Sequence, residues 1–331
     1  MASTDAHPGE TGTGPLGARI RTVVGVASRR VAGLPPRALV ASLVCVQWLL
    51  VVATWLEVGH AGSLAIVIPQ VVVLVPVALT LVYATALRLG GRVFAVWATA
   101  VWIVLPYAGR MYALPSLRHD YTHVFLPHLL GLADDPRFPA MVAFLAAMAF
   151  TLRAIETGLT IDVAIAVAAA GVGAAFVPRE ALVALAPLAA LALSGERRRN
   201  AIGAAAALAI VLAGVGAAVA AGLLSQPFAH VRFREPVDAL ASLKENFWSG
   251  RVIEWLAIAG VLGVFRARSS AGAMIGVALL AAFLSWRIQL TPIETNLSLL
   301  RTLLPVWPAV TLAVASLPLL VPRRRPGARS V

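Results

Sequence analysis

Cysteine and charge are scarce in this chain of 331 residues. The single cysteine, Cys45, lies inside an apolar run, which excludes a disulfide framework and a cysteine-rich metal site. Charged residues make up only 13% of the sequence, hydrophobic residues make up 60%, and the mean hydropathy is +0.87. Repeated apolar runs are longer than the core helices of a globular protein need. This composition is typical of a polytopic membrane protein.

Nucleotide-binding motifs are also missing. The sequence contains no Walker A pattern and no Rossmann glycine pattern, so nucleotide-driven chemistry is disfavoured. It also contains no Ser-His-Asp spacing. Few ionisable residues stand within the apolar runs and no internal repeat is evident, which disfavours a transporter. The net charge is +12, but the arginines lie mainly at the ends of apolar runs, a pattern that favours helix orientation in a bilayer over nucleic-acid binding.

The apolar runs predict an all-α fold, a polytopic transmembrane bundle of about ten spans in one domain, 38–321. Residues 1–37 are expected to be a disordered cytoplasmic segment, and residues 322–331 a basic cytoplasmic tail. The predicted spans are 38–57, 63–87, 93–106, 138–152, 161–176, 181–194, 201–224, 252–265, 271–285 and 303–321.

The distribution of basic residues predicts which side each connection faces. With the N-terminus inside, 17 Lys and Arg residues lie inside and 10 outside. This bias predicts a multi-pass protein of the cell membrane with both termini cytoplasmic. Its external segments are then 107–137, 225–251 and 286–302. The first two alternate aromatic and charged residues at helical spacing, so we expect membrane-surface helices that cap an external cavity.

One external stretch, "LRHDYTHVFLPH" (117–128), gathers three histidines and an aspartate. In a helix His119 and His123 share a face, which is the spacing of a two-histidine site for a divalent metal. Asp120 is rotated by about 100° from His119 and does not complete that site without a bend. The alternative is an interfacial amphipathic segment whose aromatic and histidine side chains lie in the headgroup zone. Spacing alone leaves both interpretations open.

Several apolar runs resemble segments of one family of membrane enzymes. The first two are "LAIVIPQVVVLVPVALTLVYATALRLGGRVFAVWATAVWIVLP" and "AGVGAAFVPREALVALAPLAALALSGERRR". They are similar to the early helices and to the short helix pair of the GT-C superfamily of polytopic glycosyltransferases. "HVRFREPVDAL" resembles a loop of its bacterial members, and "LSLLRTLLPVWPAVTLAVAS" resembles their closing helix. The resemblance covers roughly residues 63–321. It implies transfer of a sugar from a polyprenyl-phosphate donor to an acceptor on the outer face of the membrane.

The first external connection departs from that family. The resemblance implies a long first loop that carries an acidic catalytic base, whereas this chain has only "EVGHAGS", with Glu57 and His60. Three interpretations follow: Glu57 is the base, the acid comes from elsewhere, or the protein is a non-catalytic scaffold or partner subunit. Such a scaffold would bind lipid or another membrane protein.

The chemistry of glycosyl transfer selects the candidate site residues. A carboxylate must deprotonate the acceptor hydroxyl, and cations must stabilise the departing phosphate. We expect Asp120 or Glu57 to be the base. Arginine suits the phosphate because its planar fork donates two hydrogen bonds at once, and the candidates are Arg179, Arg301, Arg110 and Arg232. The alternatives are snorkelling of these arginines to the headgroups and a structural ion pair between Arg179 and Glu180.

Overall fold

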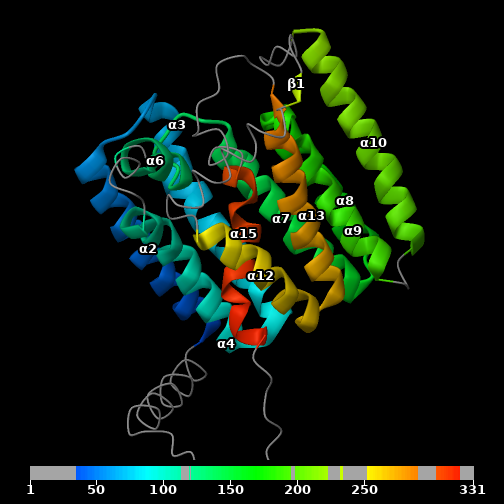
Figure 1. Cartoon of the computed structure of the whole chain (residues 1–331), viewed down its shortest axis with the longest axis horizontal. Coiled ribbons are helices and arrows are strands. Elements are labelled where there is room, and N and C mark those ends of the chain that lie inside the picture. Colours follow the sequence, from blue (N-terminus) through cyan, green and yellow to red (C-terminus); the bar gives the residue numbers. More distant parts are fainter. Residues whose placement is uncertain are drawn as a thin grey trace, which may run out of the picture.

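The computed structural model describes residues 35–112, 119, 121–194, 198–222, 232–233, 252–289 and 303–320, and nearly all of them are helical (Figure 1). The predicted all-α class is confirmed for this part of the chain, whose one sheet is an antiparallel pair of two-residue strands. Both predicted terminal segments lie outside the described residues, apart from 35–37. The elements are α2 (Pro36–Val58), α3 (Leu64–Pro69), η1 (Gln70–Leu74), α4 (Val75–Tyr112), η2 (Tyr121–Phe125), α6 (Leu126–Leu129), α7 (Arg137–Thr157), α8 (Thr160–Phe176), η3 (Pro178–Leu185), α9 (Ala186–Leu193), α10 (Arg198–Ala220), β1 (Arg232–Phe233), α12 (Val252–Ala267), α13 (Ser269–Arg287), β2 (Ile288–Gln289), η4 (Leu304–Val306), α15 (Trp307–Ala315) and η5 (Leu317–Leu320).

Among the described residues, three helical stretches are long and apolar enough to cross a membrane: Pro36–Val58, Leu64–Ala108 and Arg137–Thr157. Large apolar side chains also point outward, with Leu49 71% exposed, Leu56 84% and Ile210 74%. An apolar exterior of this kind is what a lipid environment stabilises. These features indicate a membrane protein. The other predicted spans also coincide with helices, but the apolar stretches of those helices are only 10–17 residues long, so the count of ten spans stays a prediction.

The long stretch Leu64–Ala108 is broken at Gly90 and Gly91, whose backbone is not helical; Gly91 has φ 76°. Trp48 and Thr54 lie less than two turns apart on α2. The Trp48 indole donates to the Val71 carbonyl at 2.9 Å, and the Thr54 hydroxyl lies 3.3 Å from the Tyr107 hydroxyl. A straight helix would separate Val71 from Tyr107 by about 54 Å. The chain therefore reverses at the two glycines, and both legs pack beside α2.

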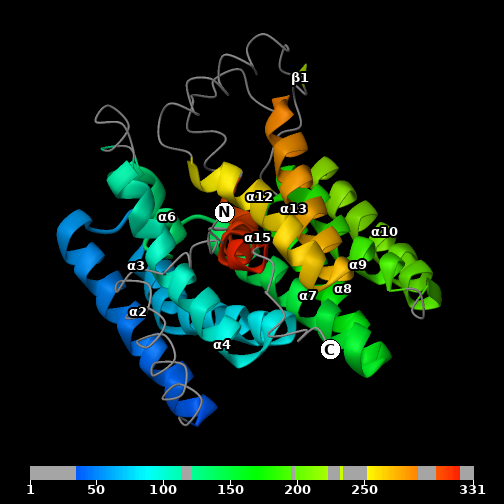
Figure 2. The ribbon, with the colours of Figure 1, turned by 60° about the horizontal axis from the view of Figure 1, so that its bottom comes forward.

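Helix α15 is the innermost element. Eight of its nine residues are buried, and Figure 2 shows it enclosed by α4, α7, α12 and α13. A helix that is apolar all round is stable only when it is covered on every side. Helix α12 approaches it most closely, because a side-chain carbon at Gly260 or Gly263 would overlap the carbonyl oxygens of Ala313 and Ser316. Glycine at these positions lets the two backbones touch.

Helix polarity divides the connections between two ends of the bundle. The arginine end comprises residues 88–92, 153–162 and 266–270. The part of α4 before Gly90 ends there, and so do helices α7 and α12. The loop end comprises residues 59–63 and 121–137 together with β1 and β2, where α2 and α13 end and α7 begins. In Figure 1 the loop end is at the top, near α3, α6 and β1, and the arginine end is toward the bottom.

Candidate functional site

The first loop (59–63) is held against residues 131–134 by backbone hydrogen bonds. The Ala61 amide donates to the Leu132 carbonyl at 3.0 Å, and the Asp134 amide donates to the Ala61 carbonyl at 2.7 Å. Gly62, at φ 102°, permits this contact because a side chain there would overlap the Asp134 side chain. The short first loop therefore has no helices of its own, and the segment before α7 covers it instead.

The Gln70 side chain also contacts residues 131–134. With its amide oriented to donate, the nitrogen lies 3.2 Å from the carbonyl oxygens of both Gly131 and Ala133. Gln70 is 4% exposed and begins the π-helix η1. A buried amide needs such partners, so the otherwise costly glutamine serves to fix residues 131–134 in place.

Two adjacent aspartates of this segment have opposite surroundings. Asp135 is 8% exposed; it accepts from the Arg137 amide at 2.8 Å and from the Arg137 guanidinium at 2.9 Å. The His128 ring lies 3.3 Å from the same carboxylate. Asp134 is exposed, and within the described part of the chain no hydrogen bond or ion pair joins its carboxylate. Asp135 is thus structural, whereas Asp134 is available to a ligand.

Each ring nitrogen of His128 faces an oxygen atom that can accept a hydrogen bond. Its Nδ1 lies 2.8 Å from the Val124 carbonyl oxygen and its Nε2 lies 3.3 Å from Asp135 Oδ2. The carbonyl oxygen can only accept, so Nδ1 carries the hydrogen of that bond. His128 therefore ties α6 to the start of α7.

The histidine pair lies on the exposed side of a buried π-helix. Tyr121 and Phe125 of η2 point into the core, where the Tyr121 hydroxyl donates to the Pro106 carbonyl at 2.7 Å and Phe125 meets the edge of Trp307 with ring centroids 5.9 Å apart. Burial raises the pKa of Tyr121, which keeps its hydroxyl a donor. The segment is therefore amphipathic, but Tyr121 and Phe125 pack into the core, whereas the interfacial interpretation expected its aromatic side chains in the headgroup zone.

His119 and His123 themselves are exposed, and their ring centroids lie 4.4 Å apart. They share a face, as the sequence predicted. No group of three or more His, Cys, Asp or Glu suited to a metal occurs in the described ranges. The two imidazoles supply two of the four ligands that zinc takes, and the divalent metal stays a prediction.

The structure places the other predicted site residues unevenly. Glu57 is exposed near the end of α2, next to the first loop. Arg110 lies in the last turn of α4, Arg179 in η3, and Arg232 in β1, where it pairs with Gln289. Asp120 and Arg301 lie outside the described residues. So does the predicted surface helix in 225–251, apart from Arg232 and Phe233, which form β1.

The connection between the predicted spans 161–176 and 181–194 belongs to the 3₁₀ helix η3, which begins at Pro178. Glu180 within it is 2% exposed, and its amide donates to the Val177 carbonyl at 3.0 Å. Its ion pair with Arg179 stays a prediction. A carboxylate at this depth requires a compensating partner or a wet cavity.

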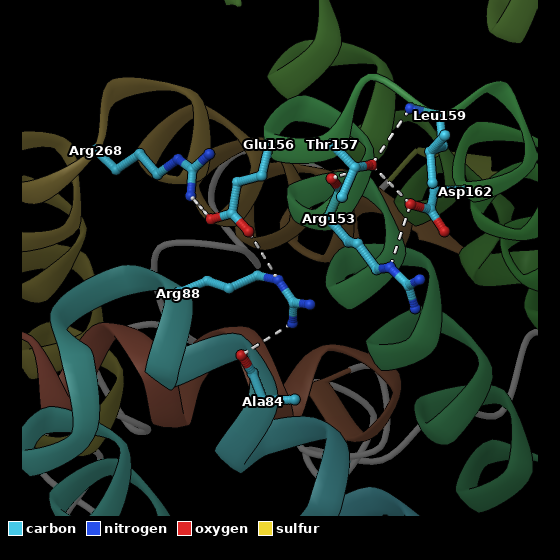
Figure 3. Close-up of polar contacts among 8 residues, drawn as sticks. All are labelled: Ala84, Arg88, Arg153, Glu156, Thr157, Leu159, Asp162 and Arg268. Carbon is cyan, nitrogen blue, oxygen red and sulfur yellow. Dashed lines mark hydrogen bonds and ion pairs between the residues drawn. The ribbon is translucent and has the colours of Figure 1, made fainter.

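A second polar cluster, which the sequence did not predict, lies at the arginine end (Figure 3). Glu156 at the end of α7 accepts from Arg88 at 3.0 Å with one oxygen and from Arg268 at 2.6 Å with the other. Nearby Asp162, 1% exposed, lies 3.3 Å from Arg153 and 2.9 Å from the Thr157 hydroxyl. These contacts join three connections that are far apart in the sequence.

An apolar cavity of about 10 Å³ lies between α7, η3, α9, α13 and η4, lined by Phe144, Met148, Val183, Pro187 and Val306 among others. That volume holds at most about one water molecule, so this cavity is no sugar site. The exposed groups of the loop end are the better candidate. Comparison with known proteins finds no matching family model, no matching curated protein and no matching solved structure.

Proposed function

We propose that the protein is a GT-C-like membrane glycosyltransferase that uses a polyprenyl-phosphate-linked sugar at its loop end. The observation that supports this proposal is the pair of exposed carboxylates beside the first loop, Glu57 before it and Asp134 held on it by backbone hydrogen bonds. The sequence resemblance supplies the substrate class. Asp134 adds a candidate for the acid that the short first loop lacks.

In the proposed reaction the carboxylate takes the proton of the acceptor hydroxyl while the oxygen of that hydroxyl attacks the anomeric carbon of the donor sugar. The bond from that carbon to the phosphate oxygen breaks, and the phosphate leaves with the electron pair. Arginines stabilise the negative charge on the leaving phosphate. Arg179 and Arg301 are the first candidates, followed by Arg110 and Arg232.

The arrangement of the connections supports a multi-pass orientation with the arginine end in the cytoplasm. The segments predicted to be cytoplasmic, 88–92, 153–160 and 266–270, meet there through Glu156. The predicted external residues 58–62 and 131–134 meet at the opposite end. Cysteines introduced at Ser116 and Ser194 are expected to react with impermeant reagents from opposite sides, and labelling from one side only would contradict this orientation.

The test is donor binding to the purified protein, followed by sugar transfer. Glu57→Gln, Asp134→Asn and Asp120→Asn separate the candidate bases, because loss of the base lowers turnover and leaves donor binding intact. Arg179→Ala or Arg301→Ala is expected to cost about 2–4 kcal/mol of transition-state stabilisation, a loss of tens to a thousand-fold. Arg37→Ala, exposed at the opposite end of α2, is the matched control.

One observation favours a non-catalytic scaffold instead. The short first loop is hydrogen-bonded to residues 131–134 through Ala61 and has no helices of its own. Donor binding without transfer to any acceptor would support the scaffold. Wild-type turnover in all of the carboxylate and arginine variants would show that the site residues are chosen wrongly.

A further inference from the structure

The arginine end carries more positive charge than its own carboxylates neutralise. Its described residues include four arginines with exposed or partly exposed side chains, Arg88, Arg153, Arg266 and Arg268, and two carboxylates, Glu156 and Asp162. An excess of cations at the end of a membrane bundle attracts anionic lipid. We propose that the arginine end binds the phosphate headgroup of an anionic phospholipid. This inference is independent of the proposed transferase activity.

The geometry of Glu156 leaves donors of both its arginines available for such a phosphate. Each carboxylate oxygen is occupied by one arginine, with Arg88 26% and Arg268 23% exposed at the side chain. Arg88 uses Nε for Glu156 and Nη1 for the Ala84 carbonyl at 3.2 Å. A guanidinium has five N–H donors. Glu156 therefore orients the guanidinium groups of Arg88 and Arg268 and leaves some of their N–H donors available.

Arg153 adds a third partly exposed cation beside this pair. Its side chain is 46% exposed, and its Nε lies 3.3 Å from the buried Asp162 carboxylate. Arg266, whose Nη1 donates to the Leu320 carbonyl at 3.1 Å, brings a further positive charge from α12. Arginines held by carboxylates and carbonyls have already lost side-chain freedom, so they bind a phosphate at a smaller entropic cost.

The same contacts could have a purely structural role, and replacing Glu156 separates the two. If the cluster only ties the three connections together, Glu156→Gln weakens the fold and leaves lipid binding unchanged. If the cluster binds an anionic headgroup, the same replacement removes a competing negative charge and strengthens that binding. The two roles therefore predict different lipid affinities for one variant.

The experiment is native mass spectrometry of the full-length protein in a non-ionic detergent, titrated with phosphatidylglycerol or with zwitterionic phosphatidylcholine. Wild type is expected to retain phosphatidylglycerol preferentially, with the preference falling as salt rises. Arg88→Gln with Arg268→Gln is expected to lower that affinity by at least about tenfold, from about fivefold per arginine. Glu156→Gln is expected to raise it severalfold.

The matched control at the loop end is Arg137→Gln, which removes one positive charge as each arginine-end replacement does and is expected to leave phosphatidylglycerol binding unchanged. If Glu156→Gln does not purify folded, Arg153→Gln replaces it and is expected to lower the affinity about fivefold. The proposal is overturned if wild type shows no preference, if the arginine-end variants match wild type, or if the loop-end control changes equally. Displacement of the lipid by millimolar inorganic phosphate would assign the site to free phosphate instead.

Discussion

The two ends of the bundle are closed by different interactions. At the arginine end, charged side chains connect distant parts of the chain, as in the Arg268–Glu156 contact between residues 112 positions apart. At the loop end, backbone hydrogen bonds connect the first loop to residues 131–134. Closure by side chains leaves spare guanidinium groups, whereas closure by backbone leaves carboxylates such as Asp134 exposed. The manner of closure therefore decides which ligands each end can attract: anions at one and, at the other, groups that donate a proton.

Each end also depends on glycines that allow two segments of backbone to come into close contact. Gly260 and Gly263 let α12 touch α15 and so fix the helix that carries Arg266 to the arginine end. Gly62 lets the first loop touch Asp134. Substitutions at these glycines disturb one end at a time and are the most direct way to separate the two modes of closure.

The largest effect is expected for Gly260→Leu. The side chain would overlap the Ala313 carbonyl and force α12 away from α15, which should lower the free energy of unfolding by more than about 3 kcal/mol. Thermal unfolding in detergent measures it. Gly214→Leu on α10, where no atom lies within 4 Å of the added carbon, is the control. Equal unfolding midpoints for the two variants would contradict the close α12–α15 contact.

A somewhat smaller effect is expected for Gly62→Ala, which should lower the free energy of unfolding by about 3 kcal/mol through backbone strain and overlap with Asp134. Gly59→Ala, at φ 83° but with open space around it, adds only the strain and should cost about 1–2 kcal/mol. Proteolysis of the loop end in detergent compares the variants. The loop-end contact would be disproved if Gly59→Ala were the more damaging.

The smallest effects distinguish the three aspartates. Asp162→Asn at the arginine end and Asp135→Asn at the loop end each lose charge-assisted contacts to a buried carboxylate, and each should cost about 2 kcal/mol of unfolding free energy. Asp134→Asn should cost no more than about 0.5 kcal/mol because the carboxylate is exposed. The three unfolding midpoints are measured side by side, and a cost for Asp134→Asn equal to the others would show that it is structural.

Much of the helical architecture could be predicted from local sequence. The apolar runs coincide with helices because a long apolar segment must satisfy its own backbone polar groups. The shared face of His119 and His123 followed from helical spacing. "ADDPR" (133–137) also contained a signal for the helix start, an aspartate before proline, although not the His128 contact.

The sequence by itself determined that this is a mostly helical, apolar protein, where its helices lie, and that arginines flank them. Only the tertiary structure decided that Gly90 and Gly91 reverse the chain, that Asp134 is placed on the first loop, and that Glu156 joins Arg88 to Arg268. The reason is physical: apolar length and periodicity act within about one helix, whereas the pairing of loops depends on how whole helices pack and which backbones glycine allows to touch.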